Sequence, residues 1–306
     1  MAPKWIFSWL APSLLALPWL AMSLQAQEHQ EGHVTNNGLQ VHYRVYGAGA
    51  PVVILSGGPG FDCDYMQPLA QKLGKGYRAI LVDLRGTGRS VPPVINHDTV
   101  NLKLTLADLE AIREQIGVER WTVLGHSAGA VLAMAYAASY PSRVSSLLLV
   151  NSGPIRAASA AAEMDNVMLH LTPQEREEMS KSGAKDFGSL FKYLAPGYFY
   201  DRSHLAQLPP AFGPANFHEE TANLLAADIF SGDGDLRPGL KDFSRPVLVI
   251  AGRQDPCDPA MQYEIHLALK NSTLRLLDRC GHFSWIEQPE QFYHAVRDFL
   301  SAHAAG

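Results

Sequence analysis

A serine that could act as a nucleophile lies in the five-residue sequence Gly125-His126-Ser127-Ala128-Gly129. The apolar run 121–124 before it is typical of a buried strand, and residues 128–139 after it are typical of a helix. A chain that passes directly from strand to helix must turn sharply, and flanking glycines remove side chains that would collide there. The helix dipole favours negative charge at the exposed serine oxygen. The pattern therefore predicts that Ser127 attacks a carbonyl carbon.

A serine hydroxyl is a weak nucleophile unless a base removes its proton. His282 is the predicted base, because it follows the last predicted strand, 274–277, at the same edge of the sheet as Ser127. Asp255 follows the predicted strand 247–250 and would orient the histidine and stabilise its charged form. Asp258 is an alternative acid, although we expect it to cap the helix that follows.

The oxyanion that forms when a serine attacks a carbonyl needs hydrogen-bond donors. The backbone N–H of Ala128, next to the nucleophile, is one predicted donor. The turn Ser56-Gly57-Gly58-Pro59-Gly60 follows an early apolar run, 52–55, and Gly58 is the predicted second donor. This chemistry requires neither a metal ion nor an organic cofactor, and we predict none.

The elements that must position these residues form a repeating pattern. Residues 39–46 alternate between apolar and polar, as in a strand with one exposed face. Short apolar runs follow, which suit strands buried on both faces, at 52–55, 79–82, 121–124, 147–150, 247–250 and, more weakly, 274–277. Helical stretches lie between several of them, at 104–116, 128–139, 261–269 and 289–301. The alternation predicts an α/β fold, with a mostly parallel sheet covered by helices on both faces.

The pattern breaks between residues 154 and 245, where helical fragments such as 173–181 occur without a convincing buried strand. We predict a helical cap insertion at 154–245, lying over the carboxyl edge of a core formed by 27–153 and 246–306. The loop 83–90, at the same edge, is predicted to brace the oxyanion turn and the serine turn through buried Arg–Asp contacts.

The N-terminus has the composition of a secretory signal peptide. Lys4 supplies a positive charge, an almost wholly apolar segment runs from residue 5 to 24, and small residues follow. We predict a signal peptide at 1–26, a periplasmic or secreted protein, and no association with the membrane after cleavage. Residues 27–37 are polar and predicted to be a mobile lead-in. With 25 basic and 30 acidic residues and no basic stripe, the sequence argues against nucleic acid as a partner.

The exported chain would contain three cysteines, at positions 63, 257 and 280. Cys257 lies two residues after Asp255, and Cys280 lies two residues before His282. Because these loops should meet at one edge of the sheet, we predict a Cys257–Cys280 disulfide, with Cys63 free.

Three motifs carry a resemblance to a known family: Gly57-Gly58-Pro59-Gly60, Asp83-x-Arg85-Gly86-x-Gly88-x-Ser90, and the order Ser127, Asp255, His282. From residue 39 onward the sequence resembles the α/β-hydrolase fold, and within it the peptidase group that includes the prolyl iminopeptidases. The resemblance implies a helical cap and the release of N-terminal residues from small peptides. Ser56, Leu84 and Ala128 depart from the group's usual residues, and the serine turn is of a type commoner among esterases.

We therefore predict a serine hydrolase that forms an acyl-enzyme, with small molecules or short peptides as substrates. An aminopeptidase is favoured, a carboxylesterase is the alternative, and a lyase or a non-catalytic binding protein on the same fold is less favoured. An aminopeptidase needs a carboxylate for the free amine of its substrate, and the insertion offers Glu163, Asp165, Glu219 and Glu220. An aromatic cluster in the insertion could line a proline or acyl pocket: Phe191, Tyr193, Tyr198, Phe199 and Tyr200.

Overall fold

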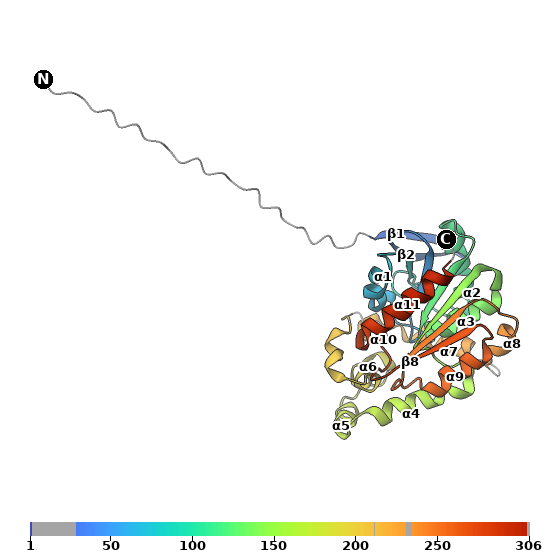
Figure 1. Ribbon diagram of the computed structural model, residues 1–306. Helices are drawn as coiled ribbons and strands as arrows, with labels where there is room; N and C mark the ends of the chain where they lie inside the picture. The colour runs from blue at the N-terminus through green and yellow to red at the C-terminus, as the bar shows by residue number, and fades with distance from the viewer. Residues whose placement is uncertain (2–28, 211, 231–233, 305–306) are drawn as a thin grey trace.

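The structure is a computed structural model that describes Met1 and residues 29–210, 212–230 and 234–304 (Figure 1). Apart from Met1, the predicted signal peptide 1–26 lies outside these residues. None of the helices in the described ranges is both long enough and apolar enough to cross a membrane.

One eight-stranded sheet forms the centre of the molecule, in the order β1-β2-β4-β3-β5-β6-β7-β8. The two pairs β1–β2 and β2–β4 are antiparallel and the other neighbours are parallel. The predicted α/β fold with a mostly parallel sheet is confirmed. The strands are β1 (Gln30–Asn36), β2 (Leu39–Tyr46), β3 (Pro51–Leu55), β4 (Arg78–Val82), β5 (Trp121–His126), β6 (Val144–Val150), β7 (Val247–Gly252) and β8 (Ser272–Leu277).

The prediction of a mobile lead-in at 27–37 is wrong over most of its length, because β1 pairs along its whole length with β2. Asn37 and Gly38 join the two strands with φ angles of 47° and 75°, and an Asn-Gly pair favours such a tight hairpin turn. Only Val34 of β1 is buried. This edge strand is held by its hydrogen bonds to β2, so it carries little of the apolar signal that identifies buried strands.

The central strands bury both of their faces, and successive residues contribute to two separate cores. In β3, Val53 and Leu55 belong to one core, whereas Val52 and Ile54 belong to the other. This division follows from the alternation of side chains along a strand. The first core is covered by α2 (Leu102–Gln115), α3 (Ala128–Ser139) and α9 (Pro259–Ala268), and the second by α1 (Gln67–Leu73) and α11 (Pro289–His303).

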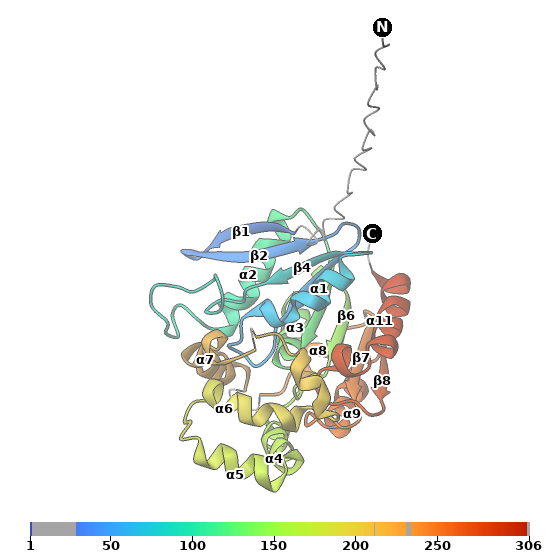
Figure 2. The same ribbon diagram turned by 90° about the vertical axis from the view of Figure 1, so that its left-hand side faces the viewer.

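Between β6 and β7 the described residues contain helices and no strand. Helix α5 begins where its sequence predicts, because Thr172 and Glu175 form a reciprocal capping box. Figures 1 and 2 both show α4 and α5 at the end of the molecule opposite to β1. The helices of the segment are α4 (Ala161–His170), α5 (Pro173–Lys181), α6 (Phe187–Leu194), α7 (Glu219–Ile229) and α8 (Arg237–Leu240). The division at 154 and 245 into core and cap stays a prediction.

The loop 83–90 contains the expected buried arginine, but its acidic partner lies elsewhere. Arg85 donates two hydrogen bonds to Asp108 of α2, at 2.7 and 2.6 Å, and both side chains are buried. This pair fastens the loop to α2, so the prediction that it braces the serine turn is wrong. The loop also contacts the segment just after the oxyanion turn, because the N–H of Gly88 donates to Asp62 at 2.5 Å.

Candidate active site

Ser127 lies between the end of β5 and the start of α3, with φ 55° and ψ −124°. This left-handed conformation is strained for a residue with a side chain. A Cβ on Gly125 would lie 2.2 Å from the carbonyl oxygen of Gly129, and one on Gly129 would lie 2.3 Å from that of Leu55. Both glycines are therefore required by the close approach of β3, β5 and α3. The turn leaves Ser127 in the wall of a pocket with 9% of its surface exposed.

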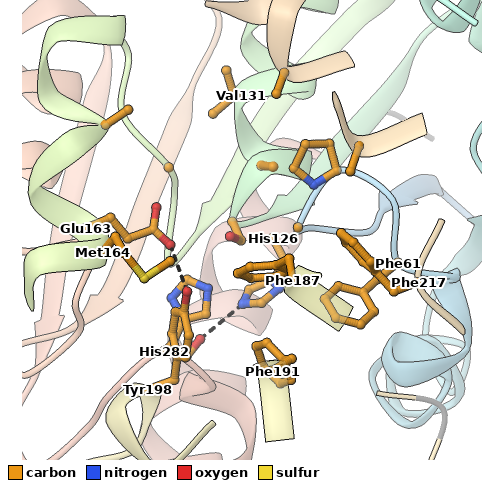
Figure 3. A pocket seen from close by; sticks show the side chains of 18 of the residues that line it. Phe61, His126, Val131, Glu163, Met164, Phe187, Phe191, Tyr198, Phe217 and His282 are labelled. Atoms are coloured by element: carbon orange, nitrogen blue, oxygen red, sulfur yellow. Dashed lines mark hydrogen bonds between the residues drawn. The ribbon is translucent and has the colours of Figure 1, made fainter. Parts of the chain in front are cut away.

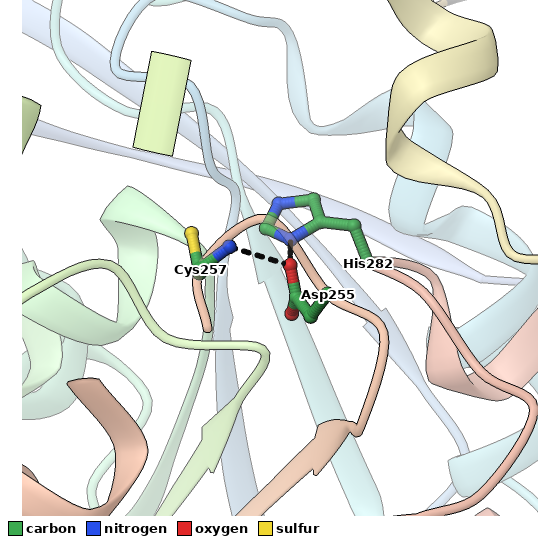
Figure 4. Close-up of side chains that lie close together, drawn as sticks. All are labelled: Asp255, Cys257 and His282. Atoms are coloured by element: carbon green, nitrogen blue, oxygen red, sulfur yellow. Dashed lines mark hydrogen bonds and ion pairs between the residues drawn. The ribbon is translucent and has the colours of Figure 1, made fainter. Parts of the chain in front are cut away.

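His282 and Asp255 contact each other, as Figure 4 shows. The Nδ1 atom of His282 lies 2.8 Å from Oδ1 of Asp255, and both residues are buried. The same carboxylate accepts a hydrogen bond from the N–H of Cys257 at 2.9 Å and one from Nδ2 of Asn151 at 2.7 Å. The aspartate is thus fixed from three sides, and His282 lines the same pocket as Ser127.

The charge of Asp255 also sets the protonation of His282. Burial by itself lowers the pKa of His282, but the adjacent carboxylate outweighs this effect and the pKa lies above its usual value of 6.5. The arrangement therefore stabilises the charged imidazolium, as a base that must briefly hold a proton requires.

Asp258, the alternative acid, lies at the start of α9, where its side chain accepts a hydrogen bond from the N–H of Met261 at 3.0 Å. It therefore has the capping role expected of it, and His282 contacts Asp255 instead.

The two predicted oxyanion donors line the pocket together with Ser127. Gly57 is not available for this role, because its N–H donates to the hydroxyl of Tyr65 at 2.7 Å. Within residues 29–210, 212–230 and 234–304, neither Gly58 N–H nor Ala128 N–H has a hydrogen-bond partner. Both groups are free to bind a substrate oxygen.

The pocket has a volume of about 350 Å³ and lies between the sheet edge and the segment that joins β6 to β7 (Figure 3). Aromatic rings from both sides dominate its wall, and the ring of Phe61 stacks on that of Phe212 with centroids 4.2 Å apart. Such a wall suits an apolar group of a small substrate. The aromatic residues are Phe61, Tyr65, Phe187, Phe191, Tyr198, Phe212, Phe217, Phe230 and Phe283.

Of the predicted aromatic cluster, Phe191 and Tyr198 line this pocket. The ring of Phe199 instead stacks on that of Phe283, with centroids 5.0 Å apart, and Tyr200 is exposed.

The four candidate carboxylates of the insertion differ in whether they line the pocket. Glu163 lies in the pocket wall on the same side as His282 (Figure 3), and its carboxylate accepts a hydrogen bond from the hydroxyl of Tyr198 at 3.2 Å. Burial of this carboxyl raises its pKa above 4.5. Glu219 also lines the pocket, from the first turn of α7, although it is exposed. Asp165 and Glu220 are exposed and do not line it.

The predicted Cys257–Cys280 disulfide is wrong, because all three cysteines are free and buried. The thiol of Cys257 faces Glu163, whereas that of Cys280 lies 3.4 Å from the hydroxyl of Ser284. The two loops do meet, but hydrogen bonds join them: Gln254 N–H donates to the carbonyl of Cys280 at 2.9 Å.

Two groups of side chains among the described residues, one buried and one partly buried, have the residue types of a metal site. In the first, His282 is already bonded to Asp255, next to Cys257. In the second, formed by Cys63, Asp64 and Asp83, the guanidinium of Arg44 lies 3.0 Å from the sulfur of Cys63 and supplies the positive charge. Both groups are thus compensated by protein atoms.

Comparison with known proteins identifies the family of this chain. A profile of the family described as alpha/beta hydrolase fold matches residues 50–289, and the chain belongs to this family. Proline iminopeptidase of Lactobacillus helveticus (strain DPC 4571) is 25% identical over 89% of this chain and 98% of its own. The same enzyme of Saccharolobus solfataricus is 27% identical over 89% of this chain and 92% of its own. The predicted resemblance to prolyl iminopeptidases is confirmed, and the chain is a hydrolase.

Solved structures share the fold. Proline iminopeptidase of Mycobacterium smegmatis superimposes with a TM-score of 0.70 at 24% identity, covering 90% of this chain and 99% of that one. Est816, described as an N-acyl homoserine lactone degrading enzyme, superimposes with a TM-score of 0.68 at 24% identity, covering 88% and 100%. At these identities the two structures are evidence for the fold alone.

Sequence reasoning missed two residues at this site. Asn151, with φ 46°, directly follows β6 and holds Asp255. Its position after a buried strand, at the same edge as the other site residues, was the available signal. Tyr65 contacts the oxyanion turn from a 3-10 helix (Cys63–Met66) that the apolar pattern does not reveal.

Proposed function

We propose that this protein is a serine hydrolase that works through an acyl-enzyme and releases N-terminal residues from short peptides. In this proposal Ser127 is the nucleophile, His282 the base, and Asp255 the acid that orients the base. The N–H groups of Gly58 and Ala128 donate to the oxyanion.

The reaction follows from the hydrogen bonds of His282. Because Nδ1–H donates to Asp255, Nε2 carries the lone pair that accepts the proton of Ser127 as its oxygen attacks the substrate carbonyl. The imidazolium then returns this proton to the leaving amine as the carbon–nitrogen bond breaks. Water, deprotonated by the same nitrogen, then attacks the acyl carbon. The bond between this carbon and Oγ of Ser127 breaks, the imidazolium returns its proton to Oγ, and the product acid leaves.

The observation that carries the peptidase proposal is Glu163, a carboxylate in an otherwise largely aromatic wall beside His282. The side chain is half-buried, and a negative charge that is partly withdrawn from water is costly unless it is compensated. The ammonium group of an N-terminal residue would compensate it. Glu219 adds a second carboxylate at the exposed part of the lining. The relatives named proline iminopeptidase, which align over most of their length, support the same substrate class.

A carboxylesterase is the second candidate. The aromatic wall would hold an apolar acyl group without any need for an amine. In that case Glu163 would be a protonated wall residue, which its raised pKa favours at acid pH.

Paired substrates separate the two candidates. The protein and its Ser127→Ala variant are assayed on prolyl and alanyl arylamides, on their N-acetylated forms, and on short p-nitrophenyl esters. Arylamide turnover that needs both Ser127 and a free amine supports the aminopeptidase. Ester turnover without arylamide turnover supports the esterase, and absence of both, with no labelling of Ser127 by a fluorophosphonate, favours a binding protein.

Export is a separate proposal, supported only by the signal-like composition of residues 1–26. It is tested by N-terminal sequencing of the protein recovered from its native host. A mature chain that starts after residue 23 or 26 supports export, and an intact N-terminus contradicts it.

A further inference from the structure

Two buried side chains next to the site, Tyr65 and His126, are joined in an unbroken series of hydrogen bonds. The N–H of Gly57 lies 2.7 Å from the hydroxyl of Tyr65, and this hydroxyl lies 2.8 Å from Nδ1 of His126. The Nε2 atom of His126 lies 3.1 Å from the carbonyl oxygen of His282, as Figure 3 shows. Both side chains are 1% exposed, so water does not compete for these bonds.

Only one arrangement of protons satisfies all three bonds. The carbonyl of His282 can only accept, so Nε2 of His126 carries a hydrogen. Burial lowers the pKa of His126 well below 6.5, with a further effect from the nearby His282, so the ring is neutral and its Nδ1 accepts. Tyr65 must then donate to Nδ1, and its oxygen accepts from Gly57. Burial also raises the pKa of Tyr65, which keeps the hydroxyl protonated.

The series connects three segments of the proposed site. Gly57 precedes the proposed oxyanion donor Gly58, and a Cβ on Gly57 would lie 2.7 Å from the Cβ of Ser127. His126 directly precedes Ser127. The backbone of His282 is bonded on both sides, because its N–H also donates to the carbonyl of Tyr198 at 2.8 Å.

The ring of His126 is also fixed by its neighbours. Trp285 meets it edge to face at 4.7 Å between centroids, and Phe283 lies at 5.5 Å. The ring therefore cannot rotate without breaking both of its hydrogen bonds.

We propose that Tyr65 and His126 are positioning residues, which hold the oxyanion turn and the histidine loop at a fixed distance from Ser127. The inference rests on the proposed acyl transfer at Ser127, but not on the choice between peptide and ester. Both rings also form part of the pocket wall, but all polar atoms of the two side chains are used within the series, so their hydrogen bonds act through Gly57 and His282. A displacement of reacting groups by about 1 Å can cost 10²-fold in rate.

The test compares Tyr65→Phe with Tyr136→Phe. Tyr136 is a control for this substitution, because this buried tyrosine of the first core also donates a hydrogen bond from its hydroxyl, to Glu110 of α2, and does not line the pocket. The assays are kcat and KM on a p-nitrophenyl ester, the rate of fluorophosphonate labelling, and amide hydrogen exchange in the peptide that contains Gly57.

We expect Tyr65→Phe to lower kcat and the labelling rate together by about 10- to 100-fold, with KM within about twofold and faster exchange at Gly57. Tyr136→Phe should leave all of these unchanged within about twofold. A second pair, His126→Gln and His126→Leu, tests the chemistry, because only glutamine keeps both an acceptor and a donor. Glutamine should retain at least about threefold more activity than leucine.

Equal kcat values and equal exchange in Tyr65→Phe and Tyr136→Phe would overturn the proposal. If the His126 variants do not fold, the tyrosine pair still decides it. If the unaltered protein neither labels nor turns over ester at Ser127, the proposed function fails first. In that case, amide exchange at Gly57 still tests whether the Tyr65 hydroxyl fixes the oxyanion turn. Unchanged exchange in Tyr65→Phe would overturn this positioning role.

Discussion

Replacement of Glu163 by glutamine tests the amine-binding part of the proposed function. The hydroxyl of Tyr198 lies 3.2 Å from the Glu163 carboxylate. Glutamine keeps the size of the side chain and an oxygen that can accept this hydrogen bond, but it removes the negative charge. Only substrates that carry an ammonium group should be affected.

The expected magnitude follows from the surroundings of the carboxylate. Two opposite charges about 4 Å apart attract by about 4 kcal/mol at an effective dielectric constant of about 20. Desolvation of the ammonium group offsets part of this attraction, and hydrogen bonds to charged groups contribute about 1.5–3 kcal/mol net. Since about 1.4 kcal/mol corresponds to a factor of ten, kcat/KM for an amino-acid arylamide should fall roughly 10- to 150-fold.

The assay measures kcat/KM for alanyl and prolyl arylamides and for a p-nitrophenyl ester that lacks an amine. Glu220→Gln is the control, because it removes the same charge from an exposed position of α7 outside the pocket. We expect ester turnover to be unchanged within about twofold in both variants. An arylamide loss in Glu163→Gln within threefold of that in Glu220→Gln would refute the reasoning, as would an equal loss on the ester.

Three further predictions concern the histidine, the loop 83–90 and the thiols. Because the pKa of His282 is raised and the base must be neutral, kcat should rise with pH through a value above 6.5. In a profile of kcat against pH, Asp255→Asn should shift this rise to a lower pH. The same substitution should decrease kcat by about 10⁴-fold. Arg85→Ala should remove the charged partner of the buried Asp108, which keeps its hydrogen bond from Asn36. The free energy of unfolding should then fall by about 3–5 kcal/mol, measured by urea denaturation. All three cysteines should react with a thiol reagent after unfolding without reduction, whereas detection of one thiol would contradict the structure.

Glu163 also has a consequence for stability. Its pKa is raised in the folded protein by burial, so the folded state holds its proton to higher pH than the unfolded state. Stability therefore falls as pH rises from the unfolded pKa near 4.5 through the folded pKa, because the charged form is disfavoured by burial. Glutamine lacks this loss, so Glu163→Gln should have a higher Tm than the unaltered protein at pH 7, and equal Tm values would contradict the assignment.

The sheet could be predicted from the sequence where its strands are buried on both faces. Runs such as 52–55 and 247–250 are apolar without interruption because both cores need them. The serine turn was also predictable, because the close approach of β3, β5 and α3 requires glycine at 125 and 129. In contrast, β1 has one buried residue and depends on its hydrogen bonds to β2. Such pairing leaves no apolar pattern in the sequence.

Tertiary contacts between distant residues were the part that sequence reasoning could not supply. The loops of Cys257 and Cys280 were correctly brought together, but the directions of their thiols depend on the neighbours Glu163 and Ser284. Likewise, the Arg–Asp contacts of the loop 83–90 were expected to brace the oxyanion turn and the serine turn, whereas Arg85 pairs with Asp108 of α2. Among the carboxylates of the insertion, only the fold separates Glu163 and Glu219, which line the pocket, from Glu220, which does not.

Ser127 is the proposed nucleophile, and covalent labelling of the folded protein followed by mass spectrometry of its peptides tests this role directly. The protein is treated with a fluorophosphonate, digested, and the modified peptide is sequenced. We expect one adduct per chain, on Ser127, which is abolished in Ser127→Ala and forms much more slowly in His282→Ala. An unmodified Ser127 in folded protein, or an adduct on another residue with Ser127 intact, would contradict it.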